Sequence, residues 1–104
     1  MIFILLASHA ADKCPLANAT TRHLILETAP KFPQLAQSAD VQLVAGPYVN
    51  REHTVVVVMR SKKAENVDRF LHESRLDQWN TIRVIPSLTL EAGLLEIEAS
   101  TPIF

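Results

Sequence analysis

The sequence has few of the residues that disulfide scaffolds, flexible linkers and nucleic-acid surfaces require. It contains one cysteine and two glycines, so no intrachain disulfide can form and no low-complexity linker is present. Ten lysines and arginines stand against eleven aspartates and glutamates, giving a net charge of -1. This balance lacks the basic excess that binds a phosphate backbone, so nucleic acid is not expected as a partner.

Long apolar runs are also missing. The N-terminal run from Ile2 to Ala7 is far shorter than the roughly 20 residues that span a bilayer, and no lysine or arginine precedes it as in a signal peptide. A lone cysteine, Cys14, is atypical of a small secreted domain. We therefore expect no membrane segment and a cytoplasmic location.

What is present suits one folded domain. The 104 residues are 48% hydrophobic and 20% charged, a balance that can bury enough apolar surface to offset the entropy lost on ordering the chain. The length is within the usual range of a domain with one hydrophobic core. We expect a single domain over residues 1–104.

Patterning predicts four strands and two helices. Strands are expected at residues 2–8, 41–49, 53–60 and 81–88, with a bulge or edge position at Gly46-Pro47. One helix is expected to begin near Cys14 and continue to residue 29, and the other lies within residues 62–76. Residues 90–99 are predicted to form a short helix or an extended arm.

The order β-α-β-β-α-β predicts an α+β fold of the ferredoxin-like type: an antiparallel four-stranded sheet with two helices on one face. Two of the strand segments, IFILLA and TVVVVM, are apolar on both faces, so the second face of the sheet must also be covered. A short C-terminal segment is one candidate cover. A second copy packing sheet to sheet covers this face more completely, so we expect a homodimer.

This topology brings three candidate site residues together. His9 ends the first strand, His53 begins the third, and Cys14 follows the first strand closely. Because the first and third strands are antiparallel neighbours, the end of one lies beside the start of the other. His72, Trp79 and Asn80 are expected near the same rim. We therefore predict that His9, Cys14 and His53 converge.

Two imidazoles and one thiolate can support two kinds of chemistry. They form a ligand set for zinc or another transition metal such as copper, with one coordination position left open. The same residues can act without metal, with Cys14 as nucleophile and histidine as base, and a helix N-terminus at Cys14 would favour its thiolate. Both residues also have a purely structural interpretation, in which Cys14 is a small buried residue and His53 is a polar residue at the start of a strand.

His23 is a second catalytic candidate. It shares a helical stripe with Leu16, Ala19 and Leu26, which is expected to face the sheet. There it is either a buried, hydrogen-bonded histidine or a general base in a cleft between helix and sheet. His72 lies among charged residues and is expected to be solvated, and Trp79 is expected to be a core or interface anchor.

Several short motifs resemble known families. Arg22-His23-Leu24, Val44-Ala45-Gly46-Pro47 and Val84-Ile85-Pro86 resemble the YCII-related branch of the dimeric α+β-barrel proteins, and the layout is similar to GYD-type domains. The resemblance implies homodimerisation through sheet faces and an active-site histidine at His23. It also implies a cleft used for cofactor-free oxygenation, isomerisation, haem handling or effector sensing. The Asp-Pro pair that follows the second helix in YCII-related proteins is missing here, and Glu73-Ser74 stands near its place.

Three functions therefore remain open. The first is a small enzyme that acts on a small organic molecule through His9, Cys14 and His53, or through His23. The second is a protein that binds a transition metal through His9, Cys14 and His53. The third is a non-catalytic module that binds or senses a small molecule, in which all four histidines are structural.

Overall fold

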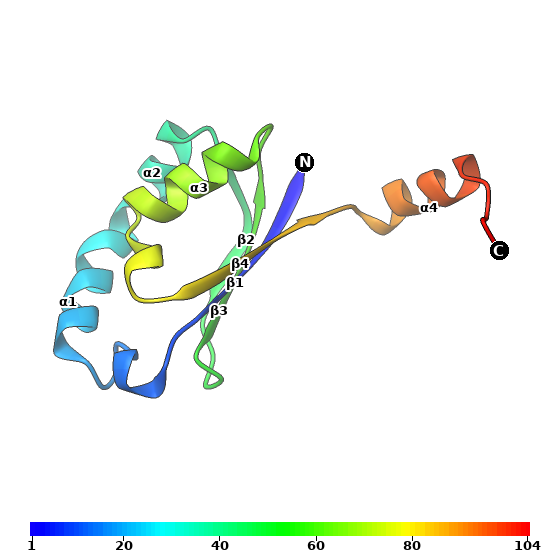
Figure 1. The fold of residues 1–104 in the computed structure, drawn as a ribbon. Coiled ribbons are helices and arrows are strands. Elements are labelled where there is room, and N and C mark those ends of the chain that lie inside the picture. The colour runs from blue at the N-terminus through cyan, green and yellow to red at the C-terminus, as the bar shows by residue number, and fades with distance from the viewer.

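A computed structural model describes residues 1–104 and contains a four-stranded antiparallel sheet (Figure 1). The strands are β1 (Ile2–Ser8), β2 (Gln42–Tyr48), β3 (Thr54–Arg60) and β4 (Thr81–Ser87), in the order β2-β3-β1-β4. The first and third strands are central, and each neighbouring pair is antiparallel. The predicted α+β class and ferredoxin-like strand order agree with this sheet.

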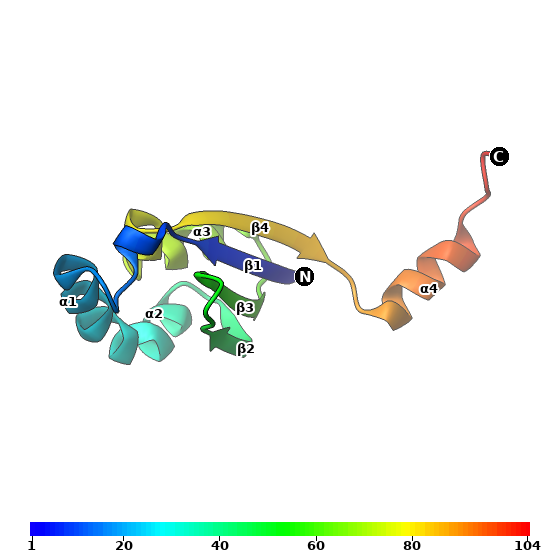
Figure 2. The same cartoon turned by 90° about the horizontal axis from the view of Figure 1, so that it is seen from below.

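Three helices lie against the sheet and a fourth extends from it. Helices α1 (Ala19–Thr28) and α2 (Phe32–Ser38) connect β1 to β2, and α3 (Ala64–Glu73) connects β3 to β4. Figures 1 and 2 show α1, α2 and α3 beside the sheet, with α4 (Leu90–Ala99) beyond the end of β4. A single-turn 3-10 segment with Pro30 separates α1 from α2, so α1 ends at Thr28, one residue before the predicted end, and α2 is a separate helix.

The first helix begins later than predicted. Asn18 caps α1, because its side-chain oxygen accepts a hydrogen bond from the Thr21 backbone N–H at 2.9 Å. Residues 11–13 form a separate 3-10 turn, which leaves Cys14 in the connection between β1 and α1. The expectation that Cys14 lies at a helix N-terminus is therefore wrong.

The core forms between the helices and one face of the sheet. Alternate residues of β1 and β3, among them Leu5 and Val57, are almost fully buried, as the period of two in a strand requires. Val67 and Phe70 of α3 are fully buried, and Ser74, which follows α3, is 1% exposed. This core fixes the two central strands, whose ends carry His9 and His53.

Strand β2 contains the irregularity that Gly46-Pro47 predicted. Its pairing with β3 shifts register between Ala45 and Tyr48. Gly46 has a φ of +81°, and an added Cβ would lie 2.6 Å from the backbone oxygen of Val56. A glycine is required there both for its positive φ and for the close approach of β3.

Candidate metal centre

The sequence-predicted convergence of His9, Cys14 and His53 is present in the structure. Ser8 and Thr54 are paired at the end of the β1–β3 ladder, and the His9 backbone N–H donates to the His53 carbonyl at 3.0 Å. One potential ligand atom from each of His9, Cys14 and His53 lies within 4.8 Å of the other two. We call these three residues the His-Cys-His group.

Local backbone structure places Cys14 in this group. Its carbonyl accepts hydrogen bonds from the N–H groups of Ala17 and Asn18, at 2.9 and 2.8 Å, which closes a turn before α1. Arg22 of α1 further ties down this connection by donating to the carbonyls of Pro15 and Leu16. Cys14 is therefore held in a buried position, with 8% of its surface exposed, by a connection anchored to α1.

His9 is oriented by a short chain of hydrogen bonds. The Asn80 amide nitrogen donates to the Leu76 carbonyl at 3.0 Å, so the amide oxygen is the atom that faces His9. That oxygen lies 3.0 Å from His9 Nδ1 and, being an acceptor, requires the proton on Nδ1. In the neutral imidazole, the opposite nitrogen, Nε2, then carries a free lone pair.

The free nitrogen of His9 is buried and has no hydrogen-bond partner in the protein. Burying a polar atom without a partner costs free energy, so such atoms are uncommon and call for a physical explanation. A metal ion held with Cys14 and His53 would satisfy this lone pair. The arrangement of Asn80, His9 and a metal would also follow the usual rule that a ligating histidine donates its other N–H to an oxygen.

Two aromatic contacts hold the imidazole of His9 in place. Its centroid lies 5.0 Å from the Trp79 ring and 5.3 Å from the His53 ring, which meets it edge-on at 74°. His53 has a φ of +56°, in the left-handed region that non-glycine residues rarely adopt. The Asn50 side chain stabilises this turn by accepting from the Glu52 and Thr54 N–H groups and donating to the Thr54 carbonyl.

The ligand types and their spacing fit a transition metal. Zinc binds sulfur at about 2.3 Å and imidazole nitrogen at about 2.0 Å, so one sulfur and two nitrogens around a tetrahedral ion are roughly 3.3–3.5 Å apart. Ligand atoms already within 4.8 Å of one another need shifts of only about 1 Å to reach these distances. Three protein ligands leave a fourth position for another molecule.

A cavity of about 340 Å³ adjoins the group, and His9 and Cys14 line it. No charged side chain contributes to its wall. The remaining lining residues are mainly apolar and come from the loops, the helices and β3: Pro15, Leu16, Ile25, Phe32, Val49, Asn50, Thr54, Val55, Leu76 and Trp79. The size is at the low end of small-molecule sites, and the wall suits an apolar molecule. The family resemblance implied a cleft, but the sequence did not predict which residues line this cavity, because they come from parts far apart in the chain.

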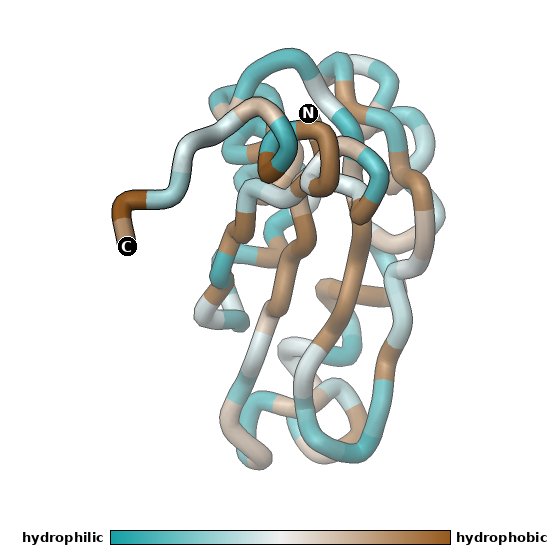
Figure 3. The backbone as a smooth tube through the Cα atoms, turned by 90° about the vertical axis from the view of Figure 1, so that its right-hand side faces the viewer, coloured by the Kyte–Doolittle hydropathy of each residue, from teal (hydrophilic) through white to brown (hydrophobic).

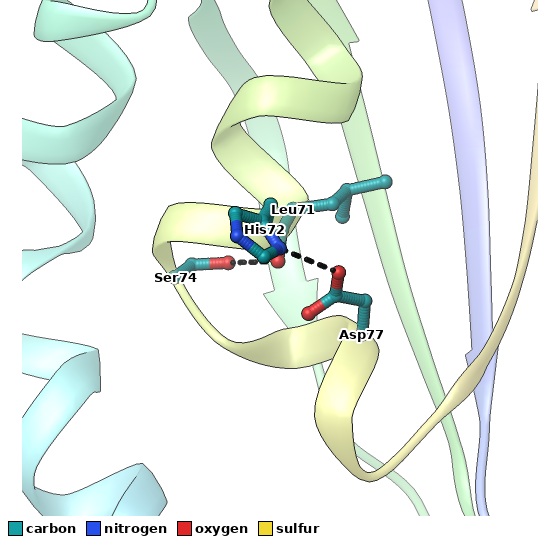
Figure 4. A network of polar contacts seen from close by, with 4 residues as sticks. All are labelled: Leu71, His72, Ser74 and Asp77. Atoms are coloured by element: carbon teal, nitrogen blue, oxygen red, sulfur yellow. Dashed lines mark hydrogen bonds and ion pairs between the residues drawn. The ribbon is translucent and has the colours of Figure 1, made fainter.

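The other two histidines lie elsewhere. His23 is on the solvent side of α1: its side chain is 86% exposed and lies 3.8 Å from Glu27. The prediction that the stripe with His23 and Leu26 faces the sheet is therefore wrong. Helix α1 buries Thr21 and Thr28 instead and exposes Leu26. His72 is solvated, as expected, and lies 3.3 Å from Asp77 near the end of α3 (Figure 4).

Comparison of the chain with protein-family models, with curated proteins and with solved structures finds no match. No helix has both the length and the apolar character needed to cross a membrane.

Proposed function

We propose that this protein binds one transition-metal ion through His9 Nε2, Cys14 Sγ and an imidazole nitrogen of His53. The observation that carries this proposal is the buried, unpartnered Nε2 of His9 beside a thiol and a second imidazole. Two nitrogens and one sulfur form a moderately soft ligand set that suits zinc or copper better than magnesium or calcium.

The adjoining cavity suggests what the ion does. Catalytic metal sites keep a coordination position open, and here three protein ligands leave such a position next to an apolar cavity. A bound ion would supply Lewis-acid or redox chemistry there. The protein's own residues would hold a small, neutral, mostly apolar molecule, because no charged group lines the cavity to recognise an ion. We therefore propose an enzyme that acts on a small organic molecule.

A cysteine nucleophile is the second candidate, and the His9–Asn80 hydrogen bond favours it. A thiol, a histidine with a free nitrogen and an asparagine that orients the ring form the same set of groups as the Cys-His-Asn arrangement of some cysteine hydrolases. In this alternative, His9 takes the proton of Cys14 and Asn80 fixes its tautomer. His53 then has no required part, which separates the two proposals experimentally.

The finer family assignment is likewise a proposal. A ferredoxin-like strand order supports the dimeric α+β-barrel superfamily suggested by the YCII-like and GYD-like motifs. The exposed position of His23 does not favour it as the active-site residue, so the His-Cys-His group is the better candidate site in this chain. A non-catalytic binding or sensing role uses the same cavity without turnover.

Elemental analysis of the purified full chain tests the metal proposal. After loading with zinc(II) or copper(I) and removal of excess ion, we expect about one ion per chain and almost none in Cys14→Ala. The variant His72→Ala, which alters an exposed histidine, should keep the ion. Failure of the unmodified chain to retain either ion would contradict the proposal. A Cys14 thiol that then reacts rapidly, and only when His9 is present, would favour the nucleophile instead.

Asn80 is expected to act as a positioning residue for His9. The variant Asn80→Ala removes the acceptor that keeps the proton on Nδ1, so metal affinity should fall by about 10–100-fold, as for other partners of ligating histidines. Asn80→Asp keeps an acceptor oxygen and should restore much of the affinity. Competition with a chromophoric chelator measures both values. Equal affinities for Asn80→Ala and the unmodified chain would show that the hydrogen bond does not tune His9.

A further inference from the structure

Helix α4 is apolar and has no partner within the chain. Leu90 is 78% exposed, Leu94 is 50% exposed and Ile97 is 68% exposed. No strand or other helix packs closely against α4, and a Cβ added at Gly93 would meet nothing within 4 Å. Figures 1 and 2 show this helix standing clear of the sheet and of the other helices.

A helix of this kind requires a surface to pack against. It has ten residues, and isolated helices shorter than about 12–15 residues are marginal in water. Leu90, Leu94 and Ile97 recur at i, i+4 and i+7 and therefore share one face. We call these three residues the α4 stripe.

A second unpartnered surface lies on the sheet. The side of β1, β3 and β4 that faces away from the core carries half-buried apolar residues: Ile4, Leu6, Val56, Val58 and Ile85. We call these five residues the outer sheet face. Figure 3 shows hydrophobic stretches along the strands and at the C-terminal end of the chain. Apolar surfaces of this kind mark sites of association.

The two surfaces have complementary charge. None of the four strands contains an aspartate or glutamate, whereas exposed Arg83 lies opposite Leu6 of the outer sheet face in the β1–β4 register. Helix α4 carries Glu91, Glu96 and Glu98 and no lysine or arginine. The three ion pairs within the chain involve neither Arg83 nor these glutamates. An acidic helix on a face with a free arginine is electrostatically favourable.

The connection to α4 directs it away from its own sheet. Only Leu88 and Thr89 separate β4 from α4, and Thr89 has extended backbone angles, with φ -65° and ψ 157°. Thr89 also caps the helix, since its Oγ1 accepts from the Ala92 N–H at 3.1 Å. After this short connection α4 continues beyond the end of β4 and does not fold back over the sheet of its own chain (Figures 1 and 2).

We propose that the α4 stripe packs on the outer sheet face of a second copy of this chain, and that the α4 stripe of the second copy packs on the outer sheet face of the first. Such a reciprocal exchange closes as a two-fold dimer and covers both apolar surfaces at once. Helix α4 leaves the sheet at the Ser87–Ile2 end, whereas the His-Cys-His group follows the opposite, Ser8–Thr81 end. The exchange is therefore independent of the proposed metal chemistry.

Light scattering after size-exclusion chromatography of the full chain is the first test. We expect a dimer for the unmodified chain and a monomer for the double variant Leu94→Glu with Ile97→Glu. The control is Leu95→Glu, which adds one negative charge about 100° further round the helix from Leu94 and should remain a dimer. A monomeric unmodified chain, or a double variant that stays dimeric, would overturn the proposal. So would equal behaviour of the double variant and Leu95→Glu.

Cross-linking identifies what covers the outer sheet face. In a Cys14→Ser background, Leu94→Cys and Val58→Cys are combined in one chain and treated with a short bismaleimide. We expect a covalent dimer. A cross-linked monomer with both cysteines consumed would show that α4 folds onto its own sheet, and a monomer that binds lipid vesicles would point to a membrane surface instead. Either result would overturn the exchange.

Discussion

Replacing His53 with alanine is expected to lower the affinity for zinc(II) or copper(I) by at least about 100-fold, because it removes one of three protein ligands. His9→Ala should cause a similar loss, since it removes the one buried side-chain nitrogen that lacks a hydrogen-bond partner. Competition with a chromophoric chelator of known affinity measures both changes.

Two exposed histidines provide matched controls for this loss. His23 pairs with Glu27 and His72 with Asp77 on the surface, so His23→Ala and His72→Ala should bind metal as the unmodified chain does. If His53→Ala retained full affinity while Cys14→Ala lost it, His53 would not be a ligand. The cysteine-nucleophile alternative would then gain weight, because it requires only Cys14, His9 and Asn80.

Phe70→Ala is expected to destabilise the fold by about 3–5 kcal/mol, a large share of the 5–15 kcal/mol that stabilises a typical domain. Phe70 is fully buried on α3, and its ring meets that of Phe32 edge-on with centroids 5.9 Å apart. Deleting it leaves a cavity where α2, α3 and the sheet meet. Urea denaturation at one fixed protein concentration measures the loss in the free energy of unfolding.

Leu26→Ala is the control for this substitution. Leu26 is 69% exposed on α1, so its replacement should change the free energy of unfolding by no more than about 0.5 kcal/mol. A loss of less than about 1 kcal/mol for Phe70→Ala would contradict the described core. A loss of several kcal/mol for Leu26→Ala would instead mean that α1 buries the face on which the sequence stripe had placed Leu26 and His23.

The strands could be predicted because local sequence and tertiary burial agree in them. IFILLAS and TVVVVMR are apolar and rich in β-branched residues, and they form the two central strands. From their antiparallel order it follows directly that His9 and His53 are neighbours. Cys14 joins them because few residues separate it from the end of β1. This part of the site required only the element order.

The start and orientation of α1 were not predictable in the same way. Its sequence has a weak apolar pattern, so two faces of the helix are similar candidates for burial: one with Ala19, His23 and Leu26, the other with Thr21, Ile25 and Thr28. In the structure the second face is inside, with both threonines buried and Ile25 half-buried. Packing against the sheet, rather than helical periodicity within the segment, decided which face was inside.

The hydrogen bond to Asn80 and the apolar cavity depend on contacts between distant parts of the chain. Asn80 was expected near the rim, but its pairing with His9 spans 71 residues and depends on a second bond to Leu76. The cavity combines residues from the β1–α1 connection, α1, β3 and the segment before β4. No local pattern encodes such a combination.

X-ray absorption spectroscopy of the metal-loaded protein tests the central claim most directly, because it reports the atoms bound to the ion. We predict one sulfur at about 2.3 Å and two imidazole nitrogens at about 2.0 Å for zinc. A first shell made only of nitrogen and oxygen in the unmodified chain would contradict a metal centre built from His9, Cys14 and His53.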